Sequence, residues 1–144
     1  MVLGCVFAMV WLVDRACLPN IIWDGAKTVP VGVRILGPEN RPIAGAKIWA
    51  LAFKYDEEPT DEELAKAMSA GVTDKEGKAR LRLICGAGGS SGLFGKKGSY
   101  VVSQNVLIKA EGYRTIFTPL SNFVGGYGQP LKRRQIEFEV RMLR

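Results

Sequence analysis

The stretch Val29-Pro30-Val31-Gly32-Val33-Arg34-Ile35 indicates the fold class of this 144-residue chain. Apolar, β-branched residues occupy every second position, and a proline, a glycine and an arginine lie between them. Successive side chains of a strand point to opposite faces of a sheet, so this alternation predicts a half-buried β-strand. One face of the strand should pack into a core while the other contacts solvent.

The same alternation returns twice further along the chain. Residues 78–83 alternate cations with apolar residues, which directs the cations outward, and residues 136–142 form a similar terminal strand. Residues 46–53 are expected to pair with the first strand as a hairpin, and further strands are expected at 100–110 and 114–117. About seven short strands without alternating helices predict an all-β sandwich.

Two segments interrupt the strand pattern. Thr60, followed three residues later by Glu63, forms a capping-box motif that predicts a short inserted helix ending near Gly71. The apolar face of this helix, which should pack on the sandwich, consists of Leu64, Ala67 and Met68. Residues 86–98 are rich in glycine and serine and predict a long, mobile surface loop.

The first residues are apolar in a way typical of export signals. Residues 1–13 carry no charge, are too few to span a bilayer as a helix, and match the apolar core of a secretory signal. Ala16-Cys17 resembles the end of a bacterial lipoprotein signal, in which the cysteine bears the lipid. Secretion, membrane tethering, lipidation at Cys17, and burial as a first strand or helix all remain open. We expect a leader and linker at 1–26 and one domain at 27–144.

The composition excludes several chemistries. The chain contains no histidine, which is the usual general base near neutral pH and the commonest ligand of zinc. Its three cysteines have no metal-ligand spacing, and the acidic residues between 56 and 63 lack the order of a calcium loop. We expect no metal and no cofactor. Cys85 should be a buried core residue, unless it pairs with Cys17 in an oxidising compartment.

Three short motifs occur in order along the chain. They are Arg41-Pro42-Ile43-Ala44-Gly45-Ala46-Lys47-Ile48, Val72-Thr73-Asp74-Lys75-Glu76-Gly77-Lys78-Ala79, and Ile108-Lys109-Ala110-Glu111-Gly112-Tyr113. Together they resemble the carboxypeptidase regulatory-like domain, a transthyretin-like (prealbumin-like) Greek-key β-sandwich of exported bacterial proteins. The resemblance covers residues 29–143 and implies an accessory or adhesion-like module without catalytic residues. The segments 54–71 and 86–98 depart from the short family pattern.

Charge is concentrated in the second half of the chain. Residues 78–144 hold twelve basic and three acidic residues, within a net charge of +6 for the whole chain. Outward-facing Arg80 and Arg82 belong to this basic half, and Glu137 and Glu139 are placed to neutralise arginines on neighbouring strands. The candidate ligand-binding residues, cations and loop aromatics together, are Phe94, Lys96, Lys97, Tyr127, Lys132, Arg133 and Arg134.

These observations favour a non-catalytic binding or structural module of the bacterial cell envelope. Loops at one end of the sandwich would hold a partner protein or glycan, in the periplasm, anchored to the outer membrane, or secreted. The main alternative is a cytoplasmic domain that binds nucleic acid or another polyanion through its basic half. A hydrolase using carboxylates such as Asp74 or Glu111, or using Cys85, is a third interpretation. An uncovered strand edge would leave self-association open.

Overall fold

A computed structural model describes residues 21–52, 57–67, 69–92, 95–124, 128–130 and 133–144. Several sequence predictions therefore lie outside the described residues. They concern the leader up to residue 20 with Cys17, and the side chains of Met68, Phe94, Lys96, Tyr127 and Lys132. No helix in the described ranges is both long and apolar enough to cross a membrane.

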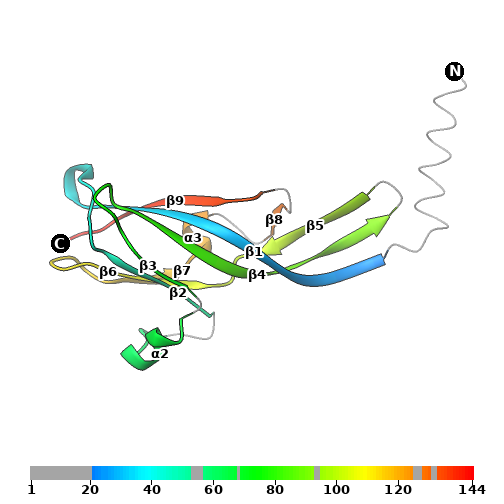
Figure 1. The fold of residues 1–144 in the computed structure, drawn as a ribbon, viewed down its shortest axis with the longest axis horizontal. Helices are drawn as coiled ribbons and strands as arrows, with labels where there is room; N and C mark the ends of the chain where they lie inside the picture. The colour runs from blue at the N-terminus through cyan, green and yellow to red at the C-terminus, as the bar shows by residue number, and fades with distance from the viewer. Residues whose placement is uncertain (1–20, 53–56, 68, 93–94, 125–127, 131–132) are drawn as a thin grey trace, which may run out of the picture.

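The fold is all-β, and its strands form two sheets (Figure 1). Sheet A has the order β8-β5-β4-β1-β9, and sheet B has the order β3-β2-β6-β7. The strands are β1 (Ile21–Leu36), β2 (Lys47–Leu51), β3 (Ser69–Val72), β4 (Lys78–Gly92), β5 (Gly95–Val101), β6 (Asn105–Lys109), β7 (Ile116–Pro119), β8 (Gln129–Pro130) and β9 (Ile136–Arg141). The short helical elements are η1 (Pro38–Asn40), α2 (Asp61–Ala65) and α3 (Ser121–Val124). The all-β sandwich prediction is confirmed, with nine strands in the described ranges where about seven were expected.

The core lies between the inner faces of the two sheets. The alternation that predicted the first strand is confirmed, because Val29, Val31, Val33 and Ile35 are each at most 2% exposed. Residues of β2 and β6 face them from sheet B, with Ile48 and Ile108 fully buried. The terminal strand β9 also exists as predicted, and it pairs in parallel with β1 from Val31↔Ile136 to Leu36↔Arg141.

The inserted helix is present and covers part of sheet B. Thr60 accepts a hydrogen bond from the backbone N–H of Glu63, whose side chain accepts one from the backbone N–H of Thr60. Leu64 packs with Leu51 and Leu107 on the outer side of sheet B. The helix ends at Ala65, however, and Gly71 belongs to β3. Sheet A has no comparable helix on its outer face in the described structure, so that face is open to solvent.

The predicted hairpin between residues 29–35 and 46–53 is wrong. β1 belongs to sheet A and β2 to sheet B, and they share no hydrogen-bonded ladder. Both edges of β1 are already occupied near residues 31–34, by β4 on one side and β9 on the other. After η1 the chain makes a single bridge from Leu36 to Pro42, and proline has no N–H with which to continue pairing.

The predicted loop at 86–98 is also wrong over its described residues. Residues 84–92 extend β4, and β5 pairs with them from Gly86↔Val101 to Gly92↔Gly95. On the other side of β4, β1 pairs from Ile21↔Ser91 to Arg34↔Lys78, so β1 begins upstream of the expected domain start at residue 27. Residues 21–28, residues 84–92 and β5 form a three-stranded extension of sheet A, here called the arm (Figure 1).

Candidate functional site

The outer face of sheet A gathers cations from two strands. Ala79, Leu81 and Leu83 of β4 point into the core, so the residues between them point outward. The outward cations are Lys78, Arg80 and Arg82, all exposed as predicted. On the adjacent β1, Arg34 lies directly opposite Lys78 in the ladder, and Gly32 lies opposite Arg80.

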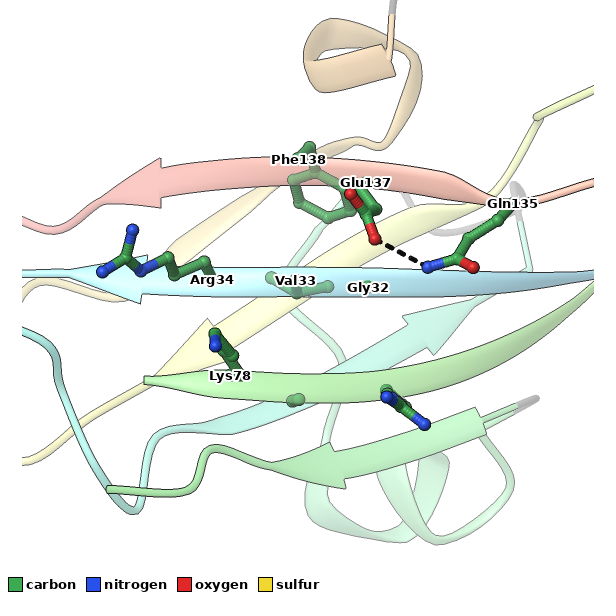
Figure 2. Close-up of a pocket in the computed structure, with 9 residues that line it drawn as sticks. Gly32, Val33, Arg34, Lys78, Gln135, Glu137 and Phe138 are labelled. Atoms are coloured by element: carbon green, nitrogen blue, oxygen red, sulfur yellow. Dashed lines mark hydrogen bonds between the residues drawn. The ribbon is translucent and has the colours of Figure 1, made fainter. Parts of the chain in front are cut away.

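A groove of about 330 Å³ crosses this face (Figure 2). Its floor includes Gly32, which has no side chain to fill the space between Arg80 on one neighbouring strand and Glu137 on the other. A Cβ added at Gly32 would lie 3.4 Å from Cγ of Glu137. The groove is therefore open because a glycine occupies an outward position in the middle strand.

The charges of this face are only partly neutralised. Arg34 Nη1 lies 3.8 Å from Glu139 Oε2, and Lys78 Nζ lies 2.6 Å from Glu76 Oε2. These pairs are exposed and each contributes at most about 1 kcal/mol. Within the described ranges, neither Arg80 nor Arg82 has a carboxylate within ion-pair distance, which leaves both guanidinium groups available for an anion.

The acidic residues of β9 behave partly as predicted. Glu139 contacts Arg34 and also Arg141, at 3.9 Å, so its predicted neutralising role is confirmed. Glu137 instead accepts a hydrogen bond of 2.7 Å from the side-chain amide of Gln135 (Figure 2). The face thus has a cationic side over β4 and an acidic side over β9.

The predicted loop residues do not form one site. Lys97 is exposed on β5, opposite Ser90 of β4, and Lys96 pairs with Ser91. Arg133 is half-buried: its Nη1 donates to Gln129 Oε1 at 2.6 Å, and it lies beside Tyr100. Lys97 and Tyr100 are three positions apart on one strand, so they point to opposite faces. Lys97 and Arg133 therefore lie on different sides of sheet A, while Arg134 is exposed.

Cys85 and Tyr100 lie next to each other, buried at the base of the arm. Both are fully buried, and burial raises the pKa of the Cys85 thiol and of the Tyr100 phenol, the latter partly opposed by Arg133. Lys27 Nζ lies 4.5 Å from the centroid of the Tyr100 ring and donates to the Arg133 carbonyl oxygen at 2.8 Å. A thiol with a raised pKa and no exposure is a poor nucleophile, so the prediction that Cys85 packs in the core is confirmed.

Asp74 has a structural role in the turn before β4. Its Oδ1 accepts hydrogen bonds from the backbone N–H groups of Glu76 and Lys78, at 2.8 and 2.9 Å. The bond from Lys78 is the main cause that lowers the pKa of Asp74. Among the described residues, no group of three His, Cys, Asp or Glu side chains is arranged to hold a metal ion.

Two further hollows are formed by described residues elsewhere on the surface. One, of about 650 Å³, lies on the arm and is lined by glycines 25, 86 and 88, by Ala87 and Val101, and by Asp24 and Ser99. The other, of about 600 Å³, lies beside α2 and mixes Lys47 and Lys109 with Asp61 and Glu111. Neither gathers side chains of one charge, so the face around Arg80 and Arg82 is the better candidate for a binding site.

The sequence analysis missed two parts of this site. It identified Arg80 and Arg82, but it singled out neither Arg34 nor Gly32. Both occupy outward positions in the stretch that predicted the first strand, and their position beside residues 78–82 depends on the pairing of β1 with β4. The register of the β1–β4 ladder brings these residues together, and local sequence patterns do not predict that register.

Among known proteins, the chain is similar in structure to a distant enzyme, and it matches no family. No family model matches the chain, and no curated protein matches it. Among solved structures, the chain is similar to 3-chlorocatechol 1,2-dioxygenase from Rhodococcus opacus 1CP, with 14% identity and a TM-score of 0.44. The match covers 83% of this chain and 60% of the dioxygenase, so the chain spans less than two thirds of that protein.

Proposed function

We propose that this chain is a non-catalytic binding module of the bacterial cell envelope that holds an anionic polymer on the outer face of sheet A. The observation that carries the proposal is the exposed pair Arg80 and Arg82, which have no carboxylate partner in the described structure. Arg80 lines the glycine-floored groove, and Arg82 is the next outward residue of β4. An open face with a shallow groove suits a polymer, which can contact several cations at once. A small anion would gain only one or two exposed contacts there.

The proposed transthyretin-like topology and carboxypeptidase regulatory-like membership rest on the three sequence motifs. One observation supports them: each motif contains a glycine with a positive φ, at Gly45 (75°), Gly77 (72°) and Gly112 (77°). Glycine adopts this left-handed conformation without steric cost. The motifs therefore correspond to three turns that need the glycine they carry, as expected of a turn signature.

The non-catalytic part of the proposal is supported by the state of the reactive groups. Cys85 is buried with a raised thiol pKa, and the Asp74 carboxylate is engaged by backbone N–H groups. No histidine exists to serve as a base. Export is proposed from the apolar residues 1–13 and from Ala16-Cys17, and mass spectrometry of the mature N-terminus in fractionated cells tests it. An intact cytosolic chain that keeps Met1 would remove the envelope assignment.

Binding is tested by retention of the full chain on an immobilised sulfated polysaccharide over a salt gradient. The double variant Arg80→Gln, Arg82→Gln should elute at lower salt than the wild type, because two unneutralised cations are lost. The matched control, Lys47→Gln with Arg114→Gln, also removes two exposed cations that have no ion-pair partner in the described ranges, and it should elute near the wild type. Equal losses in both variants would show that net charge alone causes retention, and would contradict the assigned site.

A further inference from the structure

The cations of β4 are regularly spaced along the outer face. Lys78, Arg80 and Arg82 occupy every second position of one strand, and a strand rises about 3.3–3.4 Å per residue. Neighbouring charges are therefore attached roughly 7 Å apart along a straight line. In covalent terms, six backbone bonds separate one cation-bearing Cα from the next.

A polymer fits this row when its own charges recur at the same interval. Three backbone bonds of an extended peptide span about 3.3–3.6 Å, so any extended chain with six similar bonds per repeat advances roughly 7 Å. Phosphates joined by a three-carbon unit have six bonds between successive phosphorus atoms, in the order P–O–C–C–C–O–P. The phosphates of such a chain align with successive cations of β4. A chain whose charges are more closely or more widely spaced aligns at one cation but not at the next.

From this match we propose that β4 binds a linear phosphodiester polymer of three-carbon polyol units, such as poly(glycerol phosphate), with one phosphate at each of Lys78, Arg80 and Arg82. The inference rests on the proposed function and names its ligand class. Guanidinium groups suit phosphate because their planar fork donates two hydrogen bonds to one anion.

The neighbouring strands define the path of the polymer. Glu137 and Glu139 lie on β9, which is two strands away from β4 in the sheet. Because neighbouring strands are about 4.8 Å apart, the acidic row runs about 10 Å from the row of cations. These acids repel a polyanion from β9. Between the two rows, Gly32 leaves the groove open beside Arg80. The chain would thus lie along β4 and the adjoining side of β1.

The same face argues against single-stranded nucleic acid, which has the same six-bond spacing. Proteins that bind single strands stack the bases on aromatic side chains. The outward positions in and beside the groove on β1, β4 and β9 carry proline, glycine, threonine, charged residues and Ile84, with no aromatic residue. Phe138 lines the groove, but its ring stacks on Phe123 with centroids 5.1 Å apart. The face therefore favours a phosphodiester chain without bases.

The test measures binding of the full chain to synthetic polyphosphodiesters with equal numbers of phosphates joined by two-, three- or five-carbon diols. We expect the three-carbon polymer to bind most tightly. If affinity simply rises with charge density, so that the two-carbon polymer binds best, the inference is overturned. Tighter binding of oligo(dT) than of poly(glycerol phosphate) would overturn it in favour of nucleic acid.

Salt dependence supplies an independent readout. For a single-stranded polyanion, each phosphate contact contributes about 0.7 to the slope of log affinity against log salt, so three contacts predict about a twentyfold loss between 0.05 and 0.2 M salt. Arg80→Gln with Arg82→Gln should reduce this to about threefold, whereas Lys47→Gln with Arg114→Gln should leave it unchanged. If the wild-type chain is retained on the sulfated matrix but shows no preference for linker length, this inference alone is refuted. If the wild-type chain is not retained at all, the proposed function is refuted as well.

Discussion

The two halves of the β1–β4 ladder share one register but are stabilised differently. In the sandwich half, residues 29–36 pair with 78–83 of β4 and with β9, and the inward side chains are almost fully buried under sheet B. In the arm, residues 21–28 pair with 84–91, and along the same inward side Trp23 and Ala87 are only half-buried while Gly25 is exposed. Backbone pairing thus continues without interruption into a region that lacks a full covering layer.

In the arm, strands pack closely at glycines, and the backbone takes the place of large buried side chains. Trp23 lies opposite Gly89, which in turn lies opposite Gly98 on β5. A Cβ at Gly98 would overlap the carbonyl oxygen of Gly88 and lie 2.8 Å from Cζ2 of Trp23. The indole therefore covers a pair of glycines, an arrangement known to stabilise glycine-containing strands.

The largest expected effect separates inward and outward positions of β4 where the sandwich half meets the arm. Leu83→Ala removes a fully buried side chain and should lower the free energy of unfolding by about 2–5 kcal/mol. Ile84→Ala, at the adjacent outward position, should change it by less than about 0.5 kcal/mol. Urea denaturation of both variants provides the comparison. Similar losses would mean that Ile84 is covered and that the outer face of sheet A is not open there.

A smaller effect is expected within the arm. Gly98→Ala should cost about 1–3 kcal/mol because the new methyl group meets backbone that cannot move independently. Gly86→Ala has no atom within 4 Å of the added Cβ and should be neutral or stabilising by up to about 1 kcal/mol. Amide hydrogen exchange of β4 and β5 measures both changes locally. If Gly98→Ala leaves arm protection intact, the packing of Trp23 over this glycine does not hold the arm together.

The same contrast explains how much of the fold could be predicted from the sequence. In the sandwich half, burial imposes a period of two on the residues. Residues 29–35 and 78–83 form strands as predicted, and the predicted strand at 136–142 forms over Ile136–Arg141. The arm is rich in glycines and serines, which show no alternation of apolar and polar residues and so do not indicate an inward or an outward face. Its strand pairing depends on backbone approach rather than side-chain burial, so residues 86–98 resembled a loop.

The candidate site was predictable to the extent that it depends on a single strand. The outward direction of Arg80 and Arg82 follows from the alternation within β4 alone. The positions of Arg34, Gly32 and Glu139 beside them depend on pairing between segments distant in sequence, which local patterns do not specify. The capping box at Thr60 was predictable because all its partners lie within one helical turn.

The smallest expected effect tests whether the cationic face serves binding or stability. Arg80→Gln with Arg82→Gln should change the free energy of unfolding by less than about 0.5 kcal/mol, because neither guanidinium has an ion-pair partner in the described ranges and both are exposed. Relief of repulsion among neighbouring cations would make the change slightly favourable. Thermal or urea unfolding in low salt measures it. A destabilisation above about 1 kcal/mol would show that the arginines support the sheet itself. Loss of polymer binding in that variant would then reflect altered folding, whereas unchanged stability assigns the loss to the missing contacts.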